Sequence, residues 1–248
     1  MPSHDFKSPR LHLDAGLAAG EAVAATPVQA NYLLNVLRLG EADAVLAFNG
    51  RDGEWLCRLH KPAKKKLDLV PLEQTRAQTP RPDLLSLFAP LKHARLDYMV
   101  QKAVEMGAGT LQPVMTQHVQ ASRINVERMR ANAIEAAEQC GILTIPECRE
   151  PIGFARLLAG WDASRRLVFC DEREDAESPI DTLRAMPPAP LALLVGPEGG
   201  FSEDERATLR DLPFVTVMSL GPRILRADTA AVAALAVLQA AVGDWRDG

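Results

Sequence analysis

A run of apolar residues near the C-terminal end of this chain leads directly into a glycine-rich loop and then into a helix. Residues 191–195 are all apolar, and residues 196–200 read Gly-Pro-Glu-Gly-Gly. Ser202 and Glu205 then form a capping box, so a helix begins directly after the loop. An open α/β sheet binds ligands at such strand ends, and glycines allow a positive φ and a close approach of the main chain. The alternative is a plain tight turn.

A second segment repeats this pattern. Residues 214–218 are another strand candidate, Gly221 lies in the loop that follows, and Asp228 or Thr229 is the expected N-terminal polar residue of the next helix. The first loop matches neither GxGxxG nor GxxxxGK[ST], so its spacing does not favour a dinucleotide site or a P-loop. Two such loops at adjacent strand ends can line one pocket, which favours a ligand site over two plain turns.

The chain from residue 83 onward alternates apolar runs with helical periodicity, which predicts βα units on a mainly parallel sheet. One helix is expected between the first two strands, where apolar residues recur at helical spacing, and another over residues 126–139. This part of the chain is therefore predicted to be an α/β domain. Its expected strands are residues 84–88, 110–115, 167–170, 191–195 and 214–218.

Residues 1–75 are predicted to form a small β-rich domain. Residues 44–48 and 54–59 bracket a turn rich in Asn, Asp and Gly, as in a β-hairpin, and residues 31–39 are a short helix candidate. A run of lysines at residues 64–66 either guards a sheet edge against strand pairing or contacts RNA phosphates. Residues 74–82 contain two prolines and are interpreted as the connector between domains.

The composition is typical of a soluble globular protein. Hydrophobic residues make up 47% and charged residues 24% of the chain. The longest apolar stretch, residues 230–238, is far shorter than the roughly 20 residues that span a bilayer. The four cysteines lack a CxxC pair and the five histidines lack metal-ligand spacing, so we expect reduced thiols, surface or core histidines and no metal. The N-terminus lacks a secretory apolar core, and we expect a cytoplasmic protein.

Several motifs together resemble the bacterial 16S rRNA uracil-N3 methyltransferases of the RsmE type, members of the SPOUT class. The two loops read GPEGGF and LGPRILRADTA. The stretch NYLLNVLRLGEADAVLAFNGRDGEW is similar to the family's PUA-like RNA-binding domain, and QKAVEMG and EAAEQC are similar to its central motifs. The resemblance implies an N-terminal PUA-like β-barrel domain over residues 1–75, followed by a SPOUT-type trefoil-knotted α/β domain over residues 83–248.

The resemblance also implies S-adenosylmethionine as methyl donor, a uridine in 16S rRNA of the small ribosomal subunit as acceptor, and no metal. The donor would be held by main-chain groups and apolar side chains of three loops. Uracil N3 must lose a proton, which calls for a base or a cation. Arg226 and Asp228 are the implied catalytic residues. The implied donor-binding residues are Glu172, Val195, Gly196, Glu198, Gly199, Gly200, Leu220, Gly221, Ile224 and Leu225.

Some of these residues have a structural alternative. Arg226 contacts either RNA or the uracil, or else forms a salt bridge with Asp228 or Glu198. Glu198 either orients the donor or caps its own loop. Lys102 and Glu105 lie three residues apart and are expected to pair on a helix surface.

The chain departs from the family pattern at three places. Asp228 stands where the family usually has Glu, and Asn31 where it has His. Gly141-Ile142-Leu143 replaces an arginine-containing stretch, which removes a cation near an expected RNA surface. The reaction class is unaffected by these changes, and we expect individual substrate contacts to differ.

The charge distribution assigns RNA binding to the N-terminal domain. The net charge is −4, but residues 1–75 carry nine Lys and Arg against nine Asp and Glu, whereas residues 83–248 carry 17 against 23. Phosphate contacts are therefore expected in the first domain. The candidate RNA-binding residues are Arg10, Arg38, Lys64, Lys65 and Lys66.

We also expect a homodimer that pairs through the helix over residues 229–242, because apolar residues surround this helix. The alternative is a helix that lies fully inside one subunit. The alternative function is that of a non-catalytic RNA-binding ribosome-assembly factor. The intact glycine loops favour the enzyme.

Overall fold

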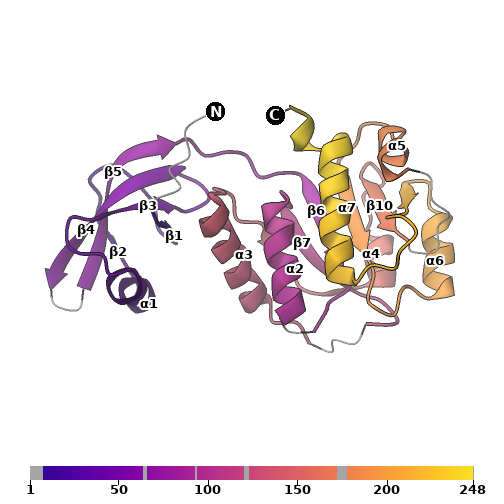
Figure 1. Ribbon diagram of the computed structural model, residues 1–248, viewed down its shortest axis with the longest axis horizontal. Helices are drawn as coiled ribbons and strands as arrows, with labels where there is room; N and C mark the ends of the chain where they lie inside the picture. The colour runs from indigo at the N-terminus through magenta and orange to yellow at the C-terminus, as the bar shows by residue number, and fades with distance from the viewer. Residues whose placement is uncertain (1–7, 64–65, 93, 120–122, 172–177, 248) are drawn as a thin grey trace. The chain divides into compact units, whose positions relative to one another are not determined.

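The computed structural model describes residues 8–63, 66–92, 94–119, 123–171 and 178–247. It divides into two compact units, whose elements are labelled in Figure 1. The first unit consists of Met1–Arg81 together with Ile134–Ile145, and the second of Pro82–Ala133 and Pro146–Gly248. The first unit is thus built from two stretches that are far apart in the sequence.

A mixed β-sheet forms the body of the first unit. The neighbouring strands β1 and β3 are parallel, and the other pairs are antiparallel. The predicted hairpin is confirmed, because Phe48 pairs with Glu54 across the turn. The strand predicted at residues 54–59 extends to Ala63, and a further long strand, which the sequence analysis did not predict, runs to Arg76, so the connector begins after Arg76. In sheet order, the described strands are β1 (Arg10–His12), β3 (Ala44–Phe48), β4 (Glu54–Ala63), β5 (Lys66–Arg76) and β2 (Val23–Ala24).

The helix of the first unit begins earlier than the sequence pattern predicts. Helix α1 (Pro27–Asn31) starts after Thr26, whose hydroxyl and main chain form a capping box with Gln29. A π-helical turn, η1 (Tyr32–Val36), follows. The predicted end at residue 39 is wrong, because Arg38 has a φ of 58° and cannot continue a right-handed helix.

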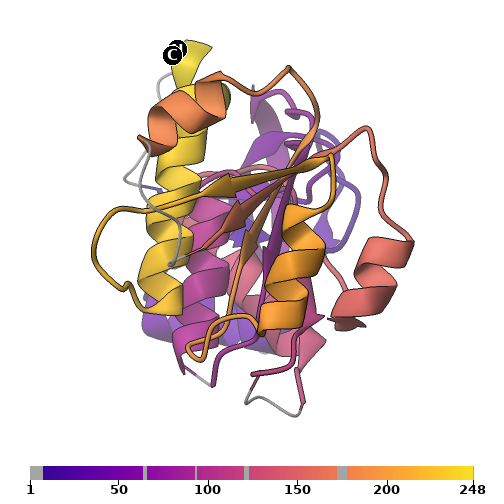
Figure 2. The ribbon, with the colours of Figure 1, turned by 90° about the vertical axis from the view of Figure 1, so that its right-hand side faces the viewer.

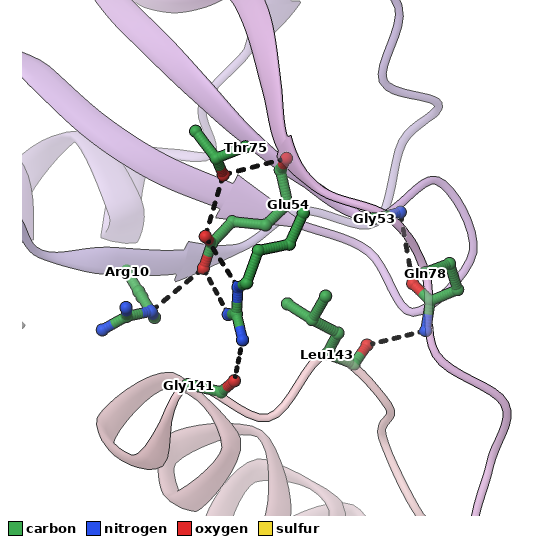
Figure 3. Close-up of polar contacts among 8 residues, drawn as sticks. Arg10, Gly53, Glu54, Thr75, Gln78, Gly141 and Leu143 are labelled. Atoms are coloured by element: carbon green, nitrogen blue, oxygen red, sulfur yellow. Dashed lines mark hydrogen bonds and ion pairs between the residues drawn. The ribbon is translucent and has the colours of Figure 1, made fainter. Parts of the chain in front are cut away.

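A buried ion-pair network holds the two stretches of the first unit together (Figure 3). The Glu54 side chain is only 4% exposed and accepts hydrogen bonds from Arg10 Nε at 3.1 Å and Arg76 Nε at 2.9 Å. Arg76 Nη1 also donates to the Gly141 carbonyl at 2.9 Å. Gly141 has a φ of +64°, which favours glycine, and an added Cβ would lie 3.4 Å from the Arg10 guanidinium.

This network corrects the expectation that Arg10 contacts RNA. Its side chain is 5% exposed and paired with Glu54, so it is not on the surface that an RNA phosphate could reach. The turn at residues 141–143, where the family has an arginine-containing stretch, packs in the same place: Leu143 is buried, and its carbonyl accepts a hydrogen bond from Gln78 at 3.3 Å.

We predict that Glu54→Gln destabilises the first unit by about 3 kcal/mol at pH 7, because it leaves buried arginines without their counter-charge. Burial raises the pKa of the Glu54 carboxyl, but the hydrogen bonds from Arg76 and Thr75 outweigh it and hold this pKa below its ordinary value. The contribution of Glu54 to the unfolding free energy is therefore present above the ordinary pKa of about 4.3 and is lost as the pH falls further.

Hydrogen exchange of the β4 and β5 amides between pH 3 and 7 measures this effect in the unit itself. Glu54→Gln should speed exchange at neutral pH and weaken its acid dependence. Glu73→Gln, which alters an exposed carboxylate of β5, is the control and should leave exchange unchanged. Equal protection in both variants would contradict the prediction.

The second unit contains a parallel sheet, and the five predicted strands are confirmed within one residue at each end. Their apolar residues are nearly all buried, as expected for strands covered on both faces. In sheet order, the described strands are β12 (Val215–Met218), β10 (Arg166–Cys170), β11 (Leu191–Val195), β6 (Leu84–Phe88), β7 (Thr110–Met115) and β8 (Glu147–Cys148), with β9 (Ile152–Gly153) paired to β7.

Figure 2 shows this sheet between two layers of helices. Helices α2, α5 and α7 pack together on one face, and α4 and α6 cover the other. None of the described helices is long and apolar enough to cross a membrane. The described helices are α2 (Ala94–Glu105), α3 (Val126–Cys140), α4 (Phe154–Ala159), α5 (Pro179–Arg184), α6 (Glu203–Arg210) and α7 (Ala227–Val242), followed by a 3-10 turn, η2 (Asp244–Asp247).

The two helix starts predicted after the loops have different outcomes. The capping box of Ser202 and Glu205 at the start of α6 is confirmed. Helix α7 begins earlier than predicted, because Arg226 has extended backbone angles and occupies the N-cap position, while Asp228 already lies in the first turn. Its carboxylate accepts a hydrogen bond from the Thr229 amide at 3.0 Å, as acidic residues at helix starts often do.

Candidate active site

A cavity of about 210 Å³ lies at the carboxyl ends of β10, β11 and β12. The residues that follow each of these strands form its walls. Nine of the ten donor-binding residues implied by the sequence line the cavity, and the tenth, Glu172, lies outside the described residues. The nine are Val195, Gly196, Glu198, Gly199, Gly200, Leu220, Gly221, Ile224 and Leu225.

The glycines of this cavity have two different roles. Gly200 and Gly221 have φ values of +69° and +94°, which other residues rarely adopt. The expected positive φ is wrong for Gly196 and Gly199, where space is what matters. A Cβ on Gly196 would lie 2.5 Å from the Phe201 ring, and one on Gly199 would lie 3.2 Å from His118 Cβ. The loop therefore depends on close packing as well as on unusual backbone angles.

The second loop presents apolar side chains and unused main-chain groups. Ile224 lines the cavity although the residue is 88% exposed, which is unusual for a large aliphatic residue. The main-chain N–H and C=O groups of Ile224 and Leu225 form no hydrogen bond with the described residues. This arrangement can hold a flat ligand that combines an apolar face with hydrogen-bonding edges.

Arg95 connects both loops, and sequence reasoning missed this role. Its Nη2 and Nε donate to the Asp228 carboxylate at 2.7 and 2.9 Å, and its Nη1 donates to Glu198. The hydrogen bond from Arg95 holds the pKa of the Asp228 carboxyl below its ordinary value, although burial acts in the opposite direction. No spacing rule predicts contacts between residues this far apart in the chain, although helical periodicity does place Arg95 at a polar position of α2.

Arg226 is not the partner of these carboxylates. Its side chain is exposed beside the cavity, and within the part of the chain that the structure describes, no hydrogen bond or ion pair of its guanidinium is recorded. The alternative of a salt bridge from Arg226 to Asp228 or Glu198 is therefore wrong, since Arg95 binds both. Neither Arg226 nor Asp228 lines the cavity itself.

Asp171 anchors the third wall of the cavity. Its side chain is fully buried directly after β10, where it accepts hydrogen bonds from Arg206 and, at 2.9 Å, from Arg210. Both arginines belong to α6, the helix that follows the glycine loop. The cavity wall after β10 is thus tied to the helix after β11.

The remaining candidates lie elsewhere. Lys102 and Glu105 form the expected pair at 2.6 Å. Cys57, Cys148 and Cys170 are free thiols, and burial raises the pKa of the Cys170 thiol to about 12. Arg38 and Lys66 are exposed on the first unit, whereas Lys64 and Lys65 lie outside the described residues. No group of His, Cys, Asp or Glu that could hold a metal ion occurs among the described side chains.

Comparisons with known proteins identify the family. A model described as an RNA methyltransferase domain matches residues 78–239, and one described as an RNA methyltransferase PUA domain matches residues 28–72. The ribosomal RNA small subunit methyltransferase E of Rickettsia conorii is 30% identical over 233 residues, which span 93% of this chain and 95% of that protein. The chain belongs to the RsmE family of RNA methyltransferases. The resemblance seen in the loop motifs is thereby confirmed.

Two solved structures of methyltransferases closely match the fold. The ribosomal RNA small subunit methyltransferase E of Neisseria gonorrhoeae, bound to S-adenosylmethionine, has a TM-score of 0.82 at 26% identity and covers 94% of this chain and 97% of its own. A putative methyltransferase of Legionella pneumophila, also with bound S-adenosylmethionine, has a TM-score of 0.82 at 28% identity and covers 95% and 98%.

We predict that Arg95→Met lowers the unfolding free energy by about 1–2 kcal/mol, because Asp228 and Glu198 then repel each other without a shared cation. Adding Asp228→Asn should restore part of the lost unfolding free energy. The double-mutant cycle then measures the coupling energy between Arg95 and Asp228. Arg128→Met is the matched control, because Arg128 forms a similar pair with Asp97 of α2 but is 64% exposed. Urea unfolding that shows equal costs for both arginines would contradict a special role for Arg95.

Proposed function

We propose that this chain transfers a methyl group from S-adenosylmethionine to N3 of a uridine in 16S rRNA of the small ribosomal subunit, in the cytoplasm. The observation that carries the proposal is the three-walled cavity at the ends of β10, β11 and β12, lined by the GPEGG and LGPRIL motifs. Relatives from Neisseria gonorrhoeae and Legionella pneumophila were solved with S-adenosylmethionine bound. We also propose that the chain of the second unit forms a trefoil knot.

The residues of the cavity fit this methyl donor. Ile224 offers an exposed apolar surface for the adenine, and the unused main-chain groups of Ile224 and Leu225 match its hydrogen-bonding edge. Glu198 lines the same cavity and supplies a negative charge for the cationic end of the donor. When bound, the donor supplies a methyl group that its sulfonium already activates.

The protein's own contribution is to position and polarise the acceptor. The exposed guanidinium of Arg226 stands at the start of α7 beside the cavity, where it can bind an RNA phosphate or stabilise negative charge on a uracil oxygen. Asp228, fixed by Arg95, holds the first turn of α7 in place. We assign the more distant RNA contacts to Arg38 and the lysine run that ends at Lys66.

We predict that Gly221→Val weakens donor binding about tenfold or more. A φ of +94° is strained for valine by about 1–3 kcal/mol, so the loop must change shape. Calorimetric titration with S-adenosylmethionine measures the affinity. Gly153→Val is the control, because Gly153 has an ordinary φ, open space around it and a place outside the cavity. Unchanged affinity in a folded Gly221→Val protein would contradict this placement of the donor.

The reaction itself is tested by mass spectrometry of 16S rRNA after incubation with donor, using both naked rRNA and assembled small subunits. The expected product is 3-methyluridine at one position. A protein that binds RNA but neither binds the donor nor forms this product would support the alternative of a ribosome-assembly factor.

A homodimer that pairs through α7 is part of the proposal. Val232, Ala233, Ala236, Val237 and Ala240 form an apolar stripe along this helix, and their side chains are partly or fully exposed in the single chain. The opposite face is buried within the chain itself. An apolar stripe of this kind on a helix is suited to a second copy of the same surface.

We predict that Ala236→Glu gives folded monomers, because it places a carboxylate within the proposed interface. Light scattering at micromolar concentration measures the oligomeric state. Ala207→Glu, at an exposed position of α6, is the control and should leave it unchanged. If the unchanged protein is itself an active monomer, this interface does not exist.

A further inference from the structure

A second, smaller hollow lies on the other side of the glycine loop from the donor cavity. Lys92 and His118 line it, and it shares Pro197, Glu198 and Gly199 with the larger cavity. Lys92 and His118 follow β6 and β7, which lie on the opposite side of β11 from β10 and β12. Residues 197–199 therefore line both hollows, so a group bound in the smaller one lies beside the donor cavity. The volume of the smaller one, about 20 Å³, has room for about one water-sized group, such as a single carbonyl oxygen of a base.

His118 is exposed, and its ring lies against the glycine loop. Its Nδ1 lies 3.2 Å from the Gly200 carbonyl oxygen. The neighbouring amide of Gln117 donates to Glu205 at 2.9 Å, which ties the His118 loop to the capping box of α6. A Cβ added at position 199 would lie 3.2 Å from His118 Cβ, so a larger residue there would crowd the histidine. Neither helical spacing nor metal-ligand spacing in the sequence predicted that His118 lies beside the glycine loop.

The contact with Gly200 determines which nitrogen of the neutral imidazole can accept a proton. A carbonyl oxygen only accepts hydrogen bonds, so Nδ1 carries the hydrogen. Nε2 of the neutral ring is then unprotonated and available as a base. The charged groups around His118 are Lys92 and Glu198, which line the same hollow, and Glu205 on the neighbouring amide.

Resting on the proposed function, we propose that this hollow receives the edge of the target uracil and that His118 is the proton acceptor of the reaction. The N3–H proton passes to His118 Nε2, and the N3 electron pair forms the new bond to the methyl carbon. The old carbon–sulfur bond breaks, and its electron pair stays on the neutral thioether that leaves. The Lys92 ammonium stabilises the negative charge that develops on a uracil oxygen. The imidazolium then returns its proton to water.

The test uses His118→Asn, since the asparagine amide can replace the Nδ1–H donor to Gly200 but cannot take up a proton. We expect kcat to fall about 10²- to 10⁴-fold at pH 7. The loss should shrink as the pH rises and hydroxide takes over the proton. Affinities for the donor and, without donor, for a 16S rRNA fragment should stay within about twofold. His60→Asn, at an exposed histidine of the first unit, is the control and should leave kcat unchanged.

A second measurement does not depend on turnover. In ¹⁵N-histidine NMR without donor, His118 should show the Nδ1–H tautomer, and its Nε2 resonance should shift when the rRNA fragment is added. Equal kcat of His118→Asn and the unchanged enzyme across the pH range would overturn the inference, and so would a loss of donor affinity, which would make His118 a structural contact. If the unchanged enzyme forms no 3-methyluridine at all, it is the proposed function that fails.

Discussion

Strand β11 pairs with β10 on one side and with β6 on the other, and this central place determines what its loop can do. The loop after β11 therefore has the loops of a neighbouring strand on each side, and its residues line both hollows. Phe201 fixes it from behind: the ring is 2% exposed, packs edge-on to Phe169 at 4.9 Å, and occupies the space that a side chain at Gly196 would need. A small change in this packing would disturb both hollows together.

Two carboxylates at the site share one cation. One guanidinium, that of Arg95, serves the two carboxylates of Asp228 and Glu198, so this cluster carries one excess negative charge. A cationic methyl donor beside Glu198 would meet that negative charge in the lining of the cavity. The family's usual Glu at position 228 would reach one methylene further, whereas Asp228 matches Arg95 with two hydrogen bonds of ordinary length. The shorter Asp228 side chain thus still forms the ion pair with Arg95.

The strands and the loop of this site could be predicted because their signals are local. Apolar runs gave the strands of the second unit, and the capping box gave the start of α6. The failures came from interactions between distant segments. Arg95 meets Glu198 and Asp228 only because the parallel sheet brings the helix after β6 to the loops after β11 and β12. Arg10 resembled an RNA contact because its buried partner, Glu54, lies on another strand.

Because the first unit is built from two stretches that lie far apart in the chain, it cannot fold completely as soon as its N-terminal part is synthesised. The stretch Ile134–Ile145 supplies the Gly141 carbonyl to Arg76 and the Glu138 carboxylate to the His12 amide at 2.8 Å. On the ribosome, the N-terminal sheet emerges long before these partners are synthesised. The first unit therefore cannot complete its own structure until the first two strands of the parallel sheet, β6 and β7, have also been translated. Although it comes first in the chain, it must remain unfinished while β6 and β7 are already leaving the exit tunnel.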